Sequence, residues 1–338
     1  MASIGEFAAG GVYSPTPATL TFRFLAWCVV ATLFTFILNT YLSFWLGWPG
    51  AGAVFGEDSG ALAWIQVLIY VAGIAGPAVF VAKTRPRTLR QDDAAITAIA
   101  TYIVKVAFWI VVLVGITDAI VSFLRVEGLL PAVFGDELAK GLGRNKFRAP
   151  YVHGPLIIAS FILAARVRTM GFQWLALLVV VAELQIVISR FIFSYEQAFM
   201  GDLVRMWYAG LFLFASAYTL IEEGHVRVDV LYSGYDQRRK GLINALGSAL
   251  LGLPFCWTII LLGMSKSTSI ITNPILSLEV TQSGFGMYIK YLMAGFLAVF
   301  AVSMAIQFTA YFLEGVADYR GDSGKRKLDS EVAAAPGD

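Results

Sequence analysis

The sequence predicts an all-α polytopic membrane protein with about eight transmembrane helices and with both termini in the cytoplasm. Two observations of composition support this fold class. Of the 338 residues, 58% are hydrophobic and only 14% are charged, whereas a soluble domain carries about 25% charged residues. A third observation is the placement of charge, because Lys and Arg gather in alternate loops between apolar runs that are long enough to cross a bilayer.

The first two apolar runs set the orientation of the chain. Residues 1–19 are mostly polar or small and are expected to form a cytoplasmic arm before apolar runs at 20–48 and 61–82. The loop between these runs contains acidic residues and neither Lys nor Arg. The loop after the second run is strongly basic, and its cations are Lys83, Arg85, Arg87 and Arg90. Since basic loops remain in the cytoplasm, we expect the first loop outside and the second inside.

Two further spans complete an N-terminal membrane region that we assign to residues 20–169. The third run, 95–123, carries Asp118 near its outer end, where the carboxylate is expected to reach the lipid headgroups. The fourth run, 154–165, is short for a span, but the two arginines that follow it indicate a return to the cytoplasm. We therefore expect this segment to cross with help from its flanks, and a re-entrant or interfacial segment is the alternative.

The C-terminal half of the chain forms a second membrane region, assigned to residues 170–318. Its four apolar runs are 172–193, 203–220, 241–264 and 287–313. A basic elbow after Asp236 suits anionic lipid headgroups, so membrane lipids are expected partners. Residues 319–338 are expected to form a disordered cytoplasmic tail. Tryptophans near the span ends are expected to anchor at the membrane interface, and these are Trp45, Trp48, Trp174 and Trp207.

Three polar side chains belong to the fifth apolar run: Glu183, Gln185 and Arg190. A carboxylate inside an apolar helix is costly unless it is paired, so we expect Glu183 to be hydrogen-bonded at a helix or subunit interface. A direct role in transport is the alternative. Gln185 projects about 200° away from Glu183 and lies on a different face. Arg190 is expected to reach Glu196 or Asp202 and to fix the acidic outer turn that contains them.

A dense polar cluster follows the sixth run, at the predicted cytoplasmic surface. Its members are Glu222, Glu223, Gly224, His225, Arg227 and Asp229. Gly224 is a natural helix stop, because glycine adopts the left-handed conformation without strain. Negative charge at a helix C-terminus opposes the helix dipole, so the two glutamates need a cation, and Arg227 is the nearest candidate. The cluster lies at the membrane surface and not at its midplane, so we expect it to fix structure or to contact another subunit.

The string Glu-Gly-His-Val-Arg-Val-Asp-Val-Leu-Tyr at residues 223–232, between a span and a basic elbow, resembles the signature of a known family. This family is the small integral-membrane, DctQ-type subunit of TRAP transporters, the tripartite ATP-independent periplasmic transporters. The glutamine and arginine of the fifth run and the acidic turn after it add to the resemblance. It covers about residues 170–318, and the extra spans before them resemble those of enlarged versions of the subunit.

The resemblance implies a bacterial inner-membrane subunit that is not an enzyme and that scaffolds a large DctM-type permease. It also implies a periplasmic solute-binding protein of the DctP type, which delivers an organic acid or related solute. Glu196 and Asp202 are expected either to face that binding protein or to lie in a solvated loop. The resemblance further implies secondary active uptake driven by an ion gradient, with sodium bound by the large subunit. We accordingly expect no catalytic, cofactor-binding or metal-binding residues in this chain and no nucleic-acid partner.

Two alternative functions remain open from the residues alone: a self-sufficient secondary transporter, or a subunit of a membrane enzyme. A bis-histidine haem site needs imidazoles that face each other, but the two histidines, His153 and His225, are predicted on opposite sides of the membrane. A lone transporter is expected to have internal repeats or broken helices with polar residues at the midplane. The sequence shows only weak signs of these. The two cysteines, Cys28 and Cys256, lie inside apolar runs and are expected to be packing residues.

Overall fold

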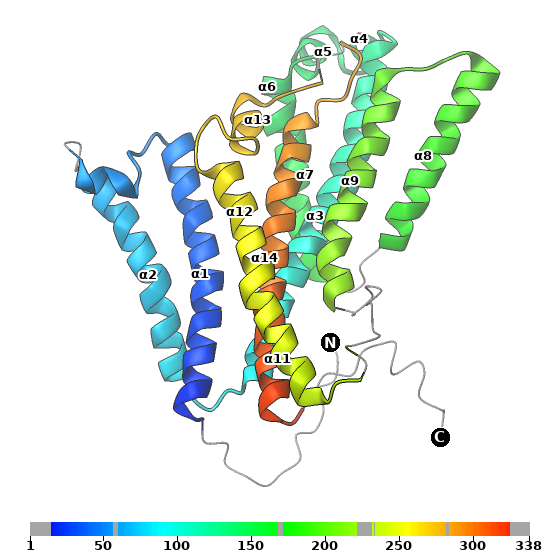
Figure 1. Cartoon of the computed structure of the whole chain (residues 1–338). Helices are drawn as coiled ribbons and strands as arrows, with labels where there is room; N and C mark the ends of the chain where they lie inside the picture. The colour runs from blue at the N-terminus through cyan, green and yellow to red at the C-terminus, as the bar shows by residue number, and fades with distance from the viewer. Residues whose placement is uncertain are drawn as a thin grey trace. The chain divides into compact units, whose positions relative to one another are not determined.

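The computed structural model describes residues 15–56, 60–167, 172–221, 232, 234–281 and 284–324, and within these ranges the regular secondary structure is helical. Eight helical segments in the described part of the chain are long and apolar enough to cross a membrane, as the sequence predicts. The side of the membrane on which each terminus lies stays a prediction. Figure 1 shows the helices along the chain.

The α-helices are α1 Pro17–Trp45, α2 Ala61–Lys83, α3 Leu89–Val126, α4 Leu130–Phe134, α5 Asp136–Leu142, α6 Asn145–Arg148, α7 Gly154–Arg166, α8 Phe172–Phe193, α9 Ala198–Ile221, α11 Gln237–Gly247, α12 Leu253–Met264, α13 Thr272–Ser277 and α14 Lys290–Arg320. A 3-10 helix occupies Ala51–Phe55, and π-helical turns occupy Ala149–His153 and Ser248–Gly252.

The two chain ends are more helical than the sequence predicts. Helix α1 starts at Pro17, inside the predicted arm, because Thr16 caps it by accepting a hydrogen bond from the Thr19 N–H at 3.3 Å and proline suits the first helical position. Helix α14 continues to Arg320, past the predicted start of the tail. The remainder of the predicted arm and tail, residues 1–14 and 325–338, lies outside the described residues.

The short fourth apolar run is extended by its flank, as expected for a crossing segment. Helix α6, the π-helical turn after it and α7 join into one helical segment, Asn145–Arg166, of 22 residues. At about 1.5 Å per residue this length spans a hydrocarbon core of about 30 Å. The length therefore favours a crossing helix over a re-entrant one.

The chain divides into two compact units, each built from separate stretches of sequence. Unit 1 consists of residues 1–99, 220–256 and 305–338, and unit 2 consists of residues 100–219 and 257–304. Each unit therefore takes residues from both of the consecutive membrane regions predicted from the sequence. The predicted boundary between residues 20–169 and 170–318 therefore stays a prediction, and it concerns where the family-like part of the chain begins.

In unit 1, helices α1 and α2 run side by side (Figure 1). Gly73 permits this approach, since a Cβ atom there would lie 2.7 Å from the Thr35 Cγ2 atom. Near the start of α1, the buried Arg23 Nε lies 2.6 Å from the buried Asp92 Oδ2. The Arg23 guanidinium also donates to the Thr84 carbonyl oxygen at 2.9 Å. A residue within the first apolar run thus holds the basic loop and the start of α3 in place.

In unit 2, α3 and α9 pack closely through small residues. A Cβ atom at Gly210 would lie 2.9 Å from Val111 Cγ2, and one at Gly115 would lie 2.6 Å from Trp207 Nε1. The buried Trp207 indole donates a hydrogen bond to the Val111 carbonyl oxygen at 3.2 Å. The prediction that Trp207 is an interface anchor is therefore wrong, because Gly115 leaves space for the indole between the two helices.

Candidate functional site

The polar cluster that the sequence singles out, with Glu222, Glu223, Gly224, His225, Arg227 and Asp229, lies outside the described residues. Its flanks are described: α9 ends at Ile221, and α11 begins at Gln237. Between them, the Tyr232 hydroxyl donates to Asn244 Oδ1 at 3.1 Å. The predicted pairing of Arg227 with the glutamates stays a prediction.

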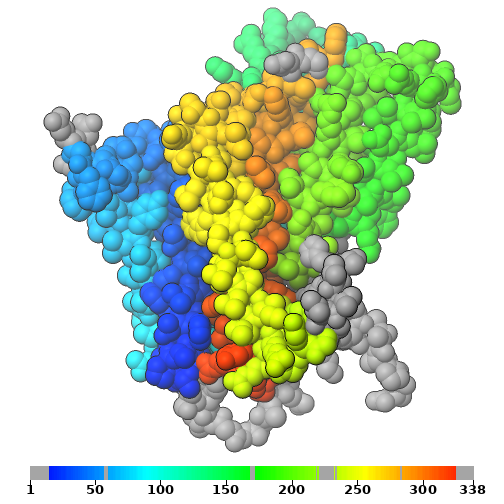
Figure 2. All heavy atoms as spheres, viewed as in Figure 1, coloured from blue at the N-terminus to red at the C-terminus, as the bar shows by residue number. Residues whose placement is uncertain are grey.

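Helix α8 carries the three intramembrane polar residues, and Glu183, Gln185 and Arg190 are all exposed on it. Only four of its residues are buried, namely Phe172, Leu175, Val179 and Ala182. All four belong to the first half of the helix and to one narrow stripe. The second half of α8 therefore contributes no buried side chain to unit 2, and in Figure 2 its exposed side chains form part of the green surface.

The outer turn between α8 and α9 contains one of the two ion pairs that the sequence leaves open for Arg190. Arg190 Nε lies 3.4 Å from Glu196 Oε2, and both side chains are more than half exposed. Ser194 begins this turn with a φ of 53°, the left-handed region that few residues other than glycine adopt. The exposed pair thus lies across a tight reversal of the chain and contributes little stability to it.

Asp202 does not fit the predicted role of a docking residue, because it is buried inside unit 2. Its Oδ2 accepts hydrogen bonds from the Thr281 hydroxyl at 2.9 Å and from the Met287 N–H at 3.0 Å. Its Oδ1 accepts from Arg205 Nη1 at 3.1 Å. The carboxylate thereby ties the start of α9 to the segment before α14, and Glu196 is left as the exposed acid of the two.

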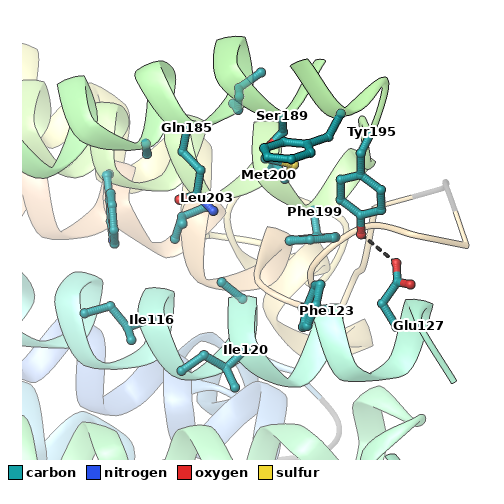
Figure 3. A pocket seen from close by; sticks show the side chains of 15 residues that line it. Ile116, Ile120, Phe123, Glu127, Gln185, Ser189, Tyr195, Phe199, Met200 and Leu203 are labelled. Atoms are coloured by element: carbon teal, nitrogen blue, oxygen red, sulfur yellow. Dashed lines mark hydrogen bonds between the residues drawn. The ribbon is translucent and has the colours of Figure 1, made fainter. Parts of the chain in front are cut away.

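A cavity of about 760 Å³ lies between α3, α8 and α9, and Figure 3 shows its lining residues. Its wall is mostly apolar and includes Phe123 and Phe199, while Gln185 projects from α8 into the space. At one end, the Tyr195 hydroxyl donates to Glu127 Oε1 at 2.7 Å. Burial, and then the hydrogen bond to the Glu127 carboxylate, raises the pKa of Tyr195 to about 12. The phenol therefore stays a donor at neutral pH.

A buried polar network in unit 2 surrounds Asp118, which sequence analysis assigns to the headgroup region. That expectation is wrong, because the Asp118 side chain is fully buried. Its Oδ1 lies 2.7 Å from Arg148 Nη1 and 3.0 Å from His153 Nε2, and its Oδ2 accepts from the Tyr288 N–H at 2.8 Å. A carboxylate within α3 is tolerated here because a buried cation and three donors compensate for its lost hydration.

The rest of the network satisfies the buried cation and imidazole. Arg148 donates through Nε and Nη2 to the Leu142 carbonyl oxygen, at 3.0 and 2.7 Å. Its guanidinium carbon lies 4.3 Å from the centre of the Tyr288 ring. His153 Nδ1 lies 2.7 Å from the Tyr291 hydroxyl. These contacts pin the segment before α7 against α3 and α14, so the network acts as a structural clamp.

The sequence carries one signal for this clamp. Asp118, Ser122 and Arg125 recur at spacings of four and three along the third run, which places them on one helix face. In the structure Arg125 donates to the Gly286 carbonyl oxygen at 2.6 Å and contacts the Tyr288 hydroxyl. The partners on the loop and on α14 have no comparable signal, because only the tertiary fold brings them together.

Within the described part of the chain, no group of three or more His, Cys, Asp or Glu side chains is placed to hold a metal ion. His153 belongs to the clamp, and Cys256 is buried among packed helices. The polar groups that the structure does bring together hold helices and turns in position.

These features define a multi-pass α-helical membrane protein whose buried polar residues serve its architecture. Residues 176–317 match the family model of the tripartite ATP-independent periplasmic transporters, DctQ component. This part of the chain is therefore similar to a DctQ-type subunit, and the helices before it fit an enlarged version of that subunit. Neither the search of curated proteins nor that of solved structures returned a match.

Proposed function

We propose that this chain is the small membrane subunit of a TRAP transporter and that it scaffolds the large DctM-type permease in the bacterial inner membrane. The observation that carries the proposal is the match of residues 176–317 to the DctQ component, which is a transporter component. The multi-pass helical architecture supports it. The alternatives, a self-sufficient secondary transporter and an enzyme subunit, have no comparable observation in their favour.

In this proposal the work of transport belongs to the partners. A periplasmic DctP-type binding protein delivers an organic acid or related solute, and the large subunit binds sodium and substrate. Transport sites lie near the bilayer midplane, where several polar groups converge. Glu183 has no such companions on α8, since Gln185 is on another face and Arg190 pairs with Glu196 at the outer turn. The chain thus braces the permease without binding cargo.

We further propose that the exposed Glu196 contributes to docking of the binding protein. Its carboxylate is half exposed beside Arg190, at a turn that the predicted orientation places on the outer side. Asp202 is left out of this proposal because its carboxylate is occupied inside unit 2.

The test is reconstitution of the three components from the source genome. The tagged chain should co-purify with the large permease, and liposomes that contain both should take up solute when the binding protein and a sodium gradient are supplied. Liposomes with this chain alone should show no uptake above empty vesicles. Uptake by the chain alone, or wild-type chain that never co-purifies with the permease, would overturn the proposal.

A further inference from the structure

Helix α8 has a side face that unit 2 leaves uncovered. Residues 176, 180, 183, 187 and 190 recur at spacings of four and three, so they form one seam along the helix. Ala176 is half-buried, and Val180, Glu183, Val187 and Arg190 are exposed. This seam, the Glu183 seam, is distinct from the cavity wall, to which α8 contributes Ala182, Gln185, Ile186, Ser189 and Phe193.

Glu183 makes this face unsuitable for contact with lipid. It is the twelfth of the 22 residues of α8, so it lies about 16 Å from either end of the helix, near the middle of the bilayer. Its side chain is exposed, and no described residue of the chain donates to it. A polar group exposed to hydrocarbon costs several kcal/mol unless it finds a hydrogen-bond partner. The seam therefore needs a donor from outside the described part of the chain.

Helix α2 shows what a lipid-facing span of this protein looks like. It is also largely exposed, with Leu68 at 61%, Val71 at 53% and Ile74 at 55% exposure. Its exposed face has no charged residue before Lys83 at the end of the helix, and its one amide, Gln66, is fully buried. Both helices are exposed to a similar degree, but only α8 places a carboxyl group at mid-span.

We propose that the Glu183 seam of α8 is the contact face for a transmembrane helix of the large permease, which presents a hydrogen-bond donor, cationic or neutral, opposite Glu183. This inference rests on the proposed function and adds the place of contact. A heptad-spaced seam with valines around one polar residue suits the packing of a single helix. A second copy of this chain is a poorer occupant, because a two-fold contact would bring Glu183 against Glu183.

Photo-crosslinking tests the face directly. A photoreactive amino acid placed at Val180 or Val187 should crosslink to the permease in membranes that contain both proteins. The matched controls are Val181 and Ile188, which are similarly exposed but lie about 100° further round the same helix. Equal crosslinking at all four positions, or adducts only with lipid or with a second copy of this chain, would overturn the proposal.

Substitution of Glu183 tests whether the permease supplies a hydrogen-bond donor to this side chain. Interhelical hydrogen bonds in membranes contribute about 0.6 to 1.7 kcal/mol, which is about threefold to seventeenfold in an association constant. We expect Glu183→Leu to lower the amount of permease that co-purifies with the chain by about this factor. Glu183→Gln, which can still accept a hydrogen bond, should retain more of the co-purified permease than Glu183→Leu. If the wild-type complex forms and Glu183→Leu leaves its recovery unchanged, this inference fails while the proposed function stands. If the wild-type chain does not bind the permease, the proposed function itself fails.

Discussion

At the scale of single residues, the strongest constraint is charge that is buried inside unit 2. Asp118 and Arg148 are both fully buried, and each is the other's ionic partner. Removal of one member of such a pair leaves the other charge without compensation, which costs about 3 to 5 kcal/mol. The pair is therefore a weak source of net stability but a strict requirement for a folded unit 2.

We expect Asp118→Asn to lower the thermal unfolding midpoint of the purified chain strongly, since Arg148 would keep its charge in a buried site. Asp236→Asn is the matched control, because Asp236 pairs with Arg239 while both are more than half exposed and exposed pairs contribute little. Unfolding is followed by circular dichroism in detergent. Similar midpoints for the two variants would show that the clamp does not hold the fold.

The Tyr195–Glu127 hydrogen bond gives a dependence on pH at one end of the cavity. The pKa of Tyr195 is raised to about 12, so the folded chain holds the phenolic proton more tightly than the unfolded chain. The resulting stability is fully present below the ordinary tyrosine pKa of about 10 and is lost as the pH rises towards 12. We expect Tyr195→Phe to remove this part of the loss of stability at alkaline pH. The measurement is the difference between the thermal unfolding midpoints of the wild-type chain and the variant, followed from neutral to alkaline pH. Superimposable profiles would contradict the assignment.

At the scale of helices, close approach through glycine determines how α3 and α9 pack. Gly210 faces Val111 with no room for a Cβ atom between them. We expect Gly210→Ala to destabilise unit 2 by about 1 to 3 kcal/mol, the usual cost of overpacking. Val111→Ala in the same chain should recover part of this loss because it removes the methyl groups in conflict.

The double-mutant cycle is measured by thermal unfolding of the two single variants and the double variant. Gly201→Ala on the same helix is a suitable control, since a Cβ atom there would meet nothing within 4 Å. Strict additivity of the Gly210 and Val111 changes would mean that the two helices do not meet at these residues.

The sequence predicts the helices better than it predicts their contacts. Long apolar runs identify the spans, because the bilayer allows only helices of sufficient length with satisfied backbone groups. The positions of Trp207 and Asp118 near span ends predict that both lie at the membrane surface. Their actual environments depend on Gly115 and Arg148, which come from other parts of the chain. For Arg190 the sequence leaves Glu196 and Asp202 open as partners, and the structure selects Glu196, which is close in sequence and joined to it by one turn.

At the scale of the whole molecule, the extra N-terminal helices are part of a compact unit and not an appendage. Unit 1 joins residues 1–99 with residues 220–256 and 305–338. Arg90 Nη2 lies 2.8 Å from Asp318 Oδ1, and Arg320 Nη1 donates to the Thr19 hydroxyl at 2.7 Å. The family-like part of the chain therefore depends on helices that lie outside it.

We expect a truncated chain that starts at residue 100 to lose unit 1, since α14 would keep its charged end without Arg90 and without the α1 surface. The measurement is the yield of monodisperse protein from detergent-solubilised membranes, compared with the full chain. The control is the full chain with Arg90→Gln, which removes one ion pair and keeps all helices. A truncated chain as monodisperse and as thermally stable as the full one would refute the conclusion that residues 220–256 and 305–338 need residues 1–99 to form a compact unit.

The clamp around Asp118 also has a consequence for biogenesis. Asp118 and Arg148 are separated by 30 positions, so the carboxylate leaves the ribosome well before its cation does. During that interval α3 reaches the translocon with an uncompensated acid, which disfavours release of the helix into lipid. We therefore expect α3 to remain beside the insertion machinery until the residues up to His153 have emerged, and to partition only as a preassembled hairpin.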